Sequence, residues 1–196
     1  MKFPCKLAIL IFDEVEVLDF CGPFEVFSIT KDNHGQSPFE VMIVAEDNTP
    51  VLARNNLSIN PQYTIKNCPK PDIILIPGGP GTRKELYNDT LIGWIKSISL
   101  ASQLTLTVCT GSLLLGKTGL LDHMEITTHH GALDLLRETA PKAEVRSDVR
   151  FIDNDRYITA AGISAGIDMS LYVVGKLLGR DIAEKTASYM EYNWTG

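Results

Sequence analysis

The chain has 196 residues and a formal net charge of -6, and its composition is 44% hydrophobic and 21% charged. These values predict one globular domain with a sizeable core, spanning residues 1–196. The sequence contains no run of lysine or arginine, which argues against nucleic acid as a partner because phosphate binding needs clustered basic charge. No stretch approaches the ~18 consecutive apolar residues of a membrane span.

The N-terminus and the cysteines bear on where the protein works. The N-terminus leads directly into a predicted strand and lacks the apolar region and cleavage site of a signal peptide. The cysteines, at positions 5, 21, 68 and 109, show no metal-ligand spacing and no dense disulfide framework. We therefore expect a cytoplasmic protein without a bound metal.

The first half of the chain alternates short apolar runs with polar and helical segments. Continuous apolar runs are typical of central strands in a parallel sheet. In chain order the pattern predicts a strand over Lys6–Phe12, a polar loop over Asp13–Asp19, a helix that begins at Gly22-Pro23 and covers Phe24–Ile29, a strand over Phe39–Ala45, a hairpin of Val51–Arg54 with Leu57–Asn60, and a strand over Asp72–Ile76. The last strand ends in a glycine-rich turn, Pro77–Gly81.

The second half continues the alternation. It predicts a helix over Leu91–Ser102, a strand over Leu104–Val108 with a helix to Thr118, a strand over Ile126–Thr128, a helix over Ala132–Thr139, a hairpin of Val145–Ile152 with Tyr157–Ala161, a helix over Ala165–Leu178, and a last helix that starts with a capping box of Asp181 and Glu184. This order predicts a three-layer α/β sandwich with a mostly parallel central sheet. Loops at the carboxyl ends of its strands should converge on one ligand site.

Cys109 lies between the strand Leu104–Val108 and a helix that opens with small residues. A cysteine in such a turn is placed like the serine of a nucleophile elbow. The unpaired N–H groups of the helix favour a thiolate, so the position predicts a lowered thiol pKa. A buried structural cysteine is the alternative.

Three further segments fall at strand ends. Asp19 could cap a helix, or it could be a carboxyl beside the thiol, with its pKa raised by a nearby anion. Gly78 and Gly79 could form only a tight turn, or the Gly79 N–H could stabilise an anion together with the Thr110 N–H. His129 and His130 could serve a thiol hydrolase, but an adjacent pair is a poor metal site and a structural role is the alternative.

The motifs quoted above, taken together and in this order, resemble the ThiJ/PfpI superfamily, with its class I glutamine amidotransferase-like, flavodoxin-like fold. The similarity covers about Lys6 to Tyr192. Four segments resemble the branch of isonitrile hydratases and of the amino-terminal domains of AraC-type regulators: Leu18–Pro23, Val108–Ser112, Thr127–His129 and Gly162–Asp168. Thr110 stands where protease-like members have histidine, and the late His-x-Glu segment of amidotransferases is missing.

The resemblance implies a homodimeric, cysteine-dependent hydratase that converts an isocyanide to an N-substituted formamide without a cofactor. Cys109 would be the nucleophile, Asp19 the acid and base, and Thr110 would orient Asp19 or the intermediate. Gly162 and Ile163 would form the pocket wall. Phe24 and Phe27 would be candidate dimer contacts.

Two other functions remain open at this point. The domain could be a ligand- or redox-sensing module, with Cys109 as the sensor and Cys21 as a resolving thiol. It could also hydrate an α-oxoaldehyde such as methylglyoxal, although relatives with that activity use a glutamate where this chain has Asp19. AraC-type regulators continue into a helix-turn-helix domain, for which we expect no room before Gly196.

Overall fold

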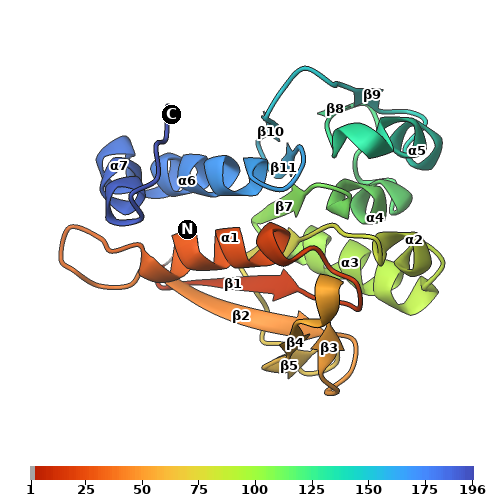
Figure 1. Ribbon diagram of the computed structural model, residues 1–196, viewed down its shortest axis with the longest axis horizontal. Helices are drawn as coiled ribbons and strands as arrows, with labels where there is room; N and C mark the ends of the chain where they lie inside the picture. The colour runs from red at the N-terminus through yellow and green to blue at the C-terminus, as the bar shows by residue number, and fades with distance from the viewer. Residues whose placement is uncertain (1–2) are drawn as a thin grey trace.

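Apolar runs form the central strands of a seven-stranded sheet in the computed structural model, which describes residues 3–196 (Figure 1). The strands lie in the order β10 (Phe151–Asn154), β11 (Tyr157–Ala160), β7 (Leu104–Val108), β6 (Ile73–Ile76), β1 (Cys5–Leu10), β2 (Phe39–Ala45) and β5 (Tyr63–Thr64). All neighbours are parallel except β10 and β11. The mostly parallel sheet predicted from the sequence is confirmed.

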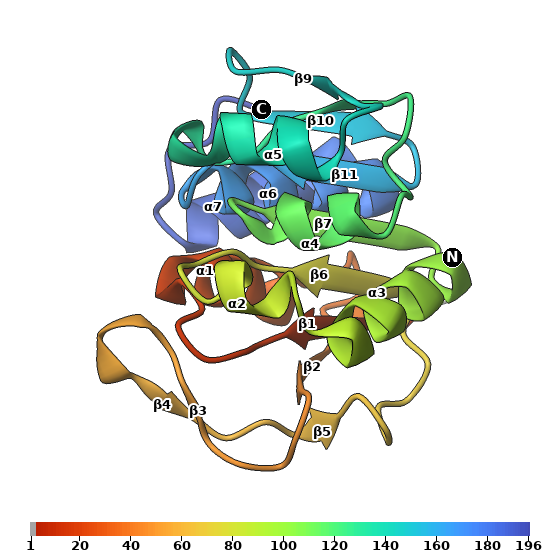
Figure 2. The same cartoon turned by 90° about the vertical axis from the view of Figure 1, so that its right-hand side faces the viewer.

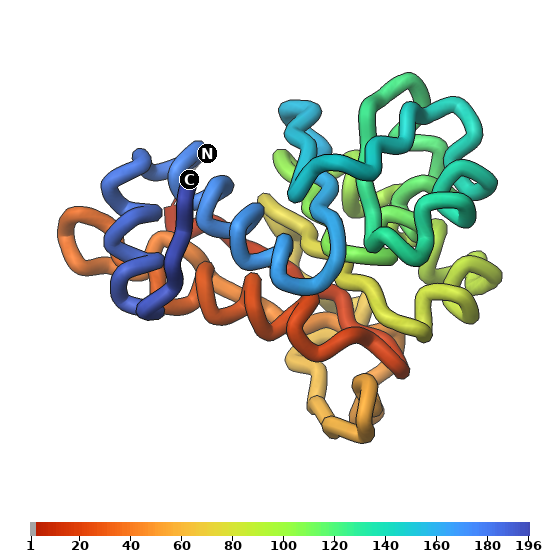
Figure 3. The backbone as a smooth tube through the Cα atoms, turned by 45° about the horizontal axis from the view of Figure 1, so that its top comes forward, coloured from red at the N-terminus to blue at the C-terminus, as the bar shows by residue number. Residues whose placement is uncertain are grey.

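Helices cover both faces of this sheet. One face carries α1 (Val17–Ile29), α6 (Ala165–Leu178) and α7 (Arg180–Tyr189), and the other carries α2 (Thr82–Glu85), α3 (Asp89–Ala101), α4 (Gly111–Lys117) and α5 (Leu133–Thr139). Figure 2 shows α2 to α5 in front of the sheet, and Figure 3 shows the backbone of α1 running beside that of α6. Side chains from both layers bury the central strands, so that β6 and β7 are buried along their whole length.

Small elements lie outside the main sheet. An antiparallel pair, β3 (Val51–Leu52) with β4 (Ser58–Ile59), forms the predicted hairpin around the short helix η1 (Arg54–Asn56). A parallel pair joins β8 (Glu125–Ile126) and β9 (Glu144–Val145), and the short helix η2 (His130–Ala132) precedes α5. The strand predicted over Ile126–Thr128 is present but shorter, at Glu125–Ile126, and the structure corrects one prediction: Val145 pairs with Ile126 instead of joining the hairpin of β10 and β11.

Helix α1 begins earlier than the sequence predicts. It starts at Val17, so Asp19 lies in its first turn and Pro23 lies inside the helix. The side chain of Glu16, at the N-cap, makes no capping hydrogen bond. A proline is tolerated here although it removes one backbone donor, because the helix packs against α6. Asp19 is therefore not a capping residue, and its carboxyl is available for another role.

Two further details differ from the prediction. Helix α7 starts at Arg180 after Gly179, and no side chain caps it, so Asp181 and Glu184 do not form a capping box. Phe27 is fully buried against Phe39, with ring centroids 5.0 Å apart, and cannot be a dimer contact. Helical periodicity alone does not reveal which face of α1 packs on the sheet, so the sequence could not separate Phe27 from a surface residue.

The carboxyl ends of the parallel strands bring distant loops together. Gly78 follows β6 and contacts residues at the start of α1, and Cys109 follows β7 and contacts the end of β11 and the residue after it. This edge is where an open parallel sheet binds its ligand. No helix within residues 3–196 is long and apolar enough to cross a membrane.

Candidate active site

Cys109 lies in a sharp turn between β7 and α4. Its backbone is left-handed, with a φ of 56°, which is uncommon for a residue other than glycine and is typical of a nucleophile at a strand end. Its N–H donates to the carbonyl oxygens of Ala160 and Ala161 at 3.1 and 3.0 Å. Gly111 permits the tight turn, because a Cβ there would lie 2.0 Å from the carbonyl oxygen of Ile76.

Asp19 is fully buried beside this turn. The Gly78 N–H donates to its Oδ2 at 3.0 Å. The carboxyl also interacts with the Cys109 thiol, and the interaction affects the pKa of both groups. Among the described residues Oδ1 has no hydrogen-bond partner, whereas a side-chain hydrogen bond between the carboxyl and the thiol contributes to the pKa of both groups. The structure thus brings Asp19 and Cys109 together.

Burial dominates the acidity of Asp19. It raises the pKa of the carboxyl from 3.8 to about 7, and the Gly78 N–H and the Cys109 thiol offset only part of this effect. The carboxyl is therefore partly protonated near neutral pH. A group that donates and then accepts a proton works best in this range.

The pKa of the Cys109 thiol is raised, whereas the sequence predicted a lowered pKa. Burial first, and then the charge of Asp19, raise the pKa of Cys109 from 9.0 to about 12. The backbone N–H groups of Thr110 and Ile163 donate to the sulfur and act in the opposite direction. The helix N-terminus lowers the thiol pKa by less than the neighbouring carboxylate and the burial of the side chain, which is only 6% exposed, together raise it. When Asp19 takes up a proton its repulsion is lost, so the two groups are alternative sites for one proton.

The hydroxyl of Thr110 fixes the glycine-rich loop instead of orienting Asp19. The Gly79 N–H donates to Thr110 Oγ1 at 2.9 Å, and Thr82 Oγ1 donates to the same oxygen at 3.1 Å. Its hydrogen-bond partners within the described chain are Gly79 of this loop and Thr82, the first residue of α2. The Gly79 N–H is consequently occupied, and it does not supply the predicted anion-stabilising contact.

Ile163 supplies the second N–H at the sulfur, next to that of Thr110. Its backbone is left-handed, with a φ of 50°, which is strained for a β-branched residue. Arg150 anchors this loop, because its guanidinium donates to Ser164 Oγ at 3.3 Å and to Asp168 Oδ2 at 2.9 Å. The resemblance placed Ile163 in the pocket wall, but its role as an N–H donor could not be predicted, since that role depends on a backbone conformation that glycine would normally adopt.

Cys109 opens onto a pocket of about 310 Å³, near the lower end of the range for small-molecule sites. The lining combines expected and unexpected side chains. The residues named from the sequence are Gly79, Pro80, Cys109, Thr110, His129 and Ile163, and the additional ones are Glu16, Arg54 and Arg83. Gly162 lies behind the wall, where a Cβ would approach His129 Cδ2 to 2.4 Å. The charged lining residues come from segments that carry no motif, so sequence analysis missed them.

His129 is held as a neutral ring. Its Nδ1 accepts a hydrogen bond from the Gly131 N–H at 3.1 Å, which leaves the ring proton on Nε2. Burial, followed by the nearby His130 and Arg83, lowers its pKa below 6.5. His129 can therefore act as a hydrogen-bond donor in the pocket.

Neither a metal site nor a disulfide occupies this region. Within residues 3–196 no group of three or more histidine, cysteine, aspartate or glutamate side chains could hold a metal ion. Cys21 and Cys109 are both free thiols. Burial raises the pKa of Cys21.

Gly78 offers a test of the contact between the loop and the carboxyl. A Cβ at Gly78 would lie 2.4 Å from the Thr110 nitrogen and 2.9 Å from Asp19 Oδ2. We expect Gly78→Ala to displace Asp19 and to reduce turnover by about 10²-fold, as misplacement of about 1 Å can. Gly93→Ala, where a Cβ on α3 meets nothing within 4 Å, is the matched control and should leave turnover unchanged. Equal activity of both variants would contradict the packing described.

Comparison with known proteins identifies the family and several relatives of this chain. The model of the DJ-1/PfpI family matches residues 5–176. The chain is 33% identical over 187 residues to the isonitrile hydratase of Pseudomonas putida, covering 95% of this chain and 78% of that protein. It is 23% identical over 189 residues to the HTH-type transcriptional regulator GbdR of Pseudomonas aeruginosa; the match covers 96% of this chain but spans only about half of the regulator, 51%. A ThiJ/PfpI family protein from Pseudomonas syringae superposes with a TM-score of 0.87 at 27% identity, covering 100% of this chain and 79% of that one.

Proposed function

Because the chain belongs to the DJ-1/PfpI family, we propose that it is a cysteine-dependent hydratase that adds water to an isocyanide. The product would be an N-substituted formamide. The observation that carries the proposal is the buried contact between the Asp19 carboxyl and the Cys109 thiol, with the pKa of Asp19 raised to about 7. The 33% identity to an isonitrile hydratase supports the same reaction.

In the first step the carbon of R–N≡C takes a proton from Asp19 and a bond from the Cys109 sulfur. Proton transfer makes this carbon electrophilic, and it also removes the proton that the pair shared. The products are a covalent thioimidate, R–N=CH–S–Cys109, and an ionised Asp19. The Thr110 and Ile163 N–H groups stabilise the sulfur anion before it attacks.

In the second step Asp19 acts as the base. It takes a proton from water, whose oxygen bonds to the thioimidate carbon, and it passes that proton to the nitrogen. When the tetrahedral adduct collapses, the C–S bond breaks, the hydroxyl proton returns to Asp19 and the sulfur leaves as thiolate. The sum is one isocyanide and one water to one formamide, R–NH–CHO, so no cofactor is required.

A panel of small isocyanides with methylglyoxal as the competing substrate tests this function. We expect formamide production from isocyanides by the wild type and none by Cys109→Ala. Lactate production from methylglyoxal without formamide would identify the aldehyde reaction instead. Absence of turnover, combined with a change of stability when Cys109 is oxidised, would favour a sensor, a role suggested by the similarity to a regulator.

We further propose a homodimer that uses the exposed side of α1. Leu18 and Phe24 on this helix are large apolar side chains that are 39% and 38% exposed, and contact with a partner would remove their apolar surface from water. Sedimentation at micromolar concentration should show twice the mass of one 21.6 kDa chain. Phe24→Asp should shift the equilibrium to the monomer, and a wild type that sediments as a monomer would refute the proposal.

A further inference from the structure

The wall of the catalytic pocket carries a positive charge that the proposed reaction does not use. Arg54 forms an ion pair with Glu16, with Nη1 and Oε2 2.6 Å apart. Arg83 lines the same pocket, and no carboxylate of the described chain lies within ion-pair distance of it. The wall therefore has a net charge of +1 (Glu16 -1, Arg54 +1, Arg83 +1), although the whole chain has a net charge of -6.

One nitrogen of the Arg83 guanidinium is held by hydrogen bonds, and within the described chain the other two are not. Nη1 donates to the Gly79 carbonyl oxygen at 3.3 Å and to Thr82 Oγ1 at 3.2 Å. Nε and Nη2 make no hydrogen bond within residues 3–196. Arginine presents its donors in a planar fork that matches a carboxylate. The loop contacts thus orient a fork toward the pocket without occupying all of it.

His129 offers a second donor in the same wall. Its Nδ1 is an acceptor of the Gly131 N–H, so Nε2 carries the proton. The side chain is close enough to Arg83 for the guanidinium charge to affect it. An oxygen anion in the pocket could receive hydrogen bonds from both residues.

We infer that the substrate carries a carboxylate, which Arg83 and His129 bind while the reacting carbon lies at Cys109. The identity of the reacting group as an isocyanide rests on the proposed function, whereas the carboxylate site rests only on the pocket. In the form that starts the reaction Asp19 is neutral and the negative charge is on the Cys109 sulfur, at the reacting end of the substrate, where two backbone N–H groups donate to it. The pocket volume of about 310 Å³ restricts the substrate to a small molecule such as an isocyano acid.

Alkylation of Cys109 tests the carboxylate site without any enzyme assay. Iodoacetate and iodoacetamide react with the same thiol and differ in charge, so their rate ratio within one variant cancels changes in thiol reactivity. The rates are measured by mass spectrometry of the Cys109 peptide, with Cys68 as the internal reference. We expect Arg83→Gln to lower the iodoacetate to iodoacetamide ratio at Cys109 by about tenfold or more, and Arg83→Lys to lower it less.

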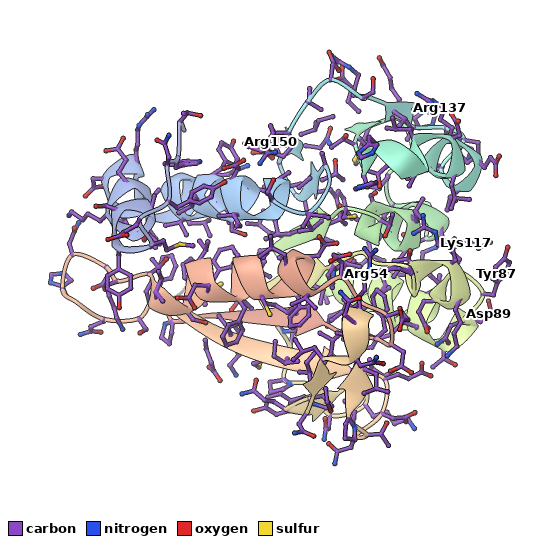
Figure 4. The ribbon with its side chains drawn as sticks, in the orientation of Figure 1. Arg54, Tyr87, Asp89, Lys117, Arg137 and Arg150 are labelled. Carbon is purple, nitrogen blue, oxygen red and sulfur yellow. The ribbon has the colours of Figure 1, made fainter. Side chains whose placement is uncertain are left out.

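Arg137→Gln is the matched control, because it removes the same charge from α5. Arg137 lies well away from Arg54, the other arginine of the pocket (Figure 4). Charges more than about 8 Å apart are largely screened at physiological salt, so this variant should keep the wild-type ratio. An unchanged ratio in Arg83→Gln, or an equal loss in Arg137→Gln, would overturn the inference.

Isocyanoacetate and its methyl ester then separate the inference from the proposed function. We expect the wild type to prefer the anion in kcat/KM, and Arg83→Gln to lose that preference mainly through KM. If neither isocyanide is converted while the alkylation ratio still depends on Arg83, the hydratase proposal fails and the carboxylate site stands. If both compounds are converted with equal efficiency by the wild type and by Arg83→Gln, the carboxylate site fails and the hydratase proposal stands.

Discussion

Replacing Cys109 by serine is expected to abolish isocyanide hydration. The thiol of Cys109 can pass its proton to the neighbouring Asp19 and receives two backbone N–H groups at the sulfur, but an alcohol is too weak an acid to form the corresponding anion without a stronger base. Formamide production should fall to background in Cys109→Ser and Cys109→Ala, as measured by chromatography of the product.

Cys68→Ser provides the matched control for this experiment. Cys68 is a half-buried free thiol whose hydrogen bond goes to the Pro69 carbonyl oxygen, away from the pocket. Its replacement should leave turnover intact. Undiminished turnover in Cys109→Ala would defeat the enzymatic and the sensory functions together, because both depend on that sulfur.

Replacing Asp19 by asparagine is expected to lower kcat by about 10²–10⁴-fold, the range for loss of a general acid and base. The amide can accept the Gly78 N–H as the carboxylate does, so the loop should keep its position. Because asparagine cannot transfer a proton, KM should change less than kcat. An isocyanide kcat close to the wild-type value would show that water is activated elsewhere.

The same variant has a predictable effect on stability. The pKa of Asp19 is about 7 in the folded protein and near 3.8 when exposed, so between these values the folded state binds more protons than the unfolded state. Stability must therefore fall as pH rises from about 4 to about 7. Asp19→Asn should remove this dependence and gain stability at pH 7 relative to the wild type, by an amount of the order of a few kcal/mol. Urea unfolding at pH 5 and pH 8 measures the difference, and parallel pH profiles for the two proteins would contradict it.

The sequence by itself determined the layers of the fold. The strands β1, β6 and β7 were predictable because continuous apolar runs are stable only where both faces of a sheet are covered. Helix α6 has the predicted bounds, Ala165–Leu178. A long apolar segment is typical of a buried helix, and the glycine that follows it marks the helix end. The site could be located as well, because the carboxyl ends of parallel strands meet at one edge whatever the loops contain.

Local patterns misled the prediction where packing outweighed propensity. Pro23 suggested a helix start, but α1 begins at Val17 and continues through the proline because its contacts with α6 and β2 stabilise it. The pattern predicted a strand at Ile126, and its pairing with Val145 forms a small sheet separate from the main one. A short apolar run does not specify which sheet it joins.

Only the tertiary structure decided the chemistry around the sulfur. Burial beside Asp19 raises the pKa of the thiol, and the second N–H comes from Ile163 in a left-handed conformation. Arg83 reaches the pocket from α2 and Glu16 from the N-cap of α1, and no motif marks either residue. Each of these features depends on desolvation or on distances between segments remote in the chain, and a one-dimensional pattern of side chains contains neither quantity.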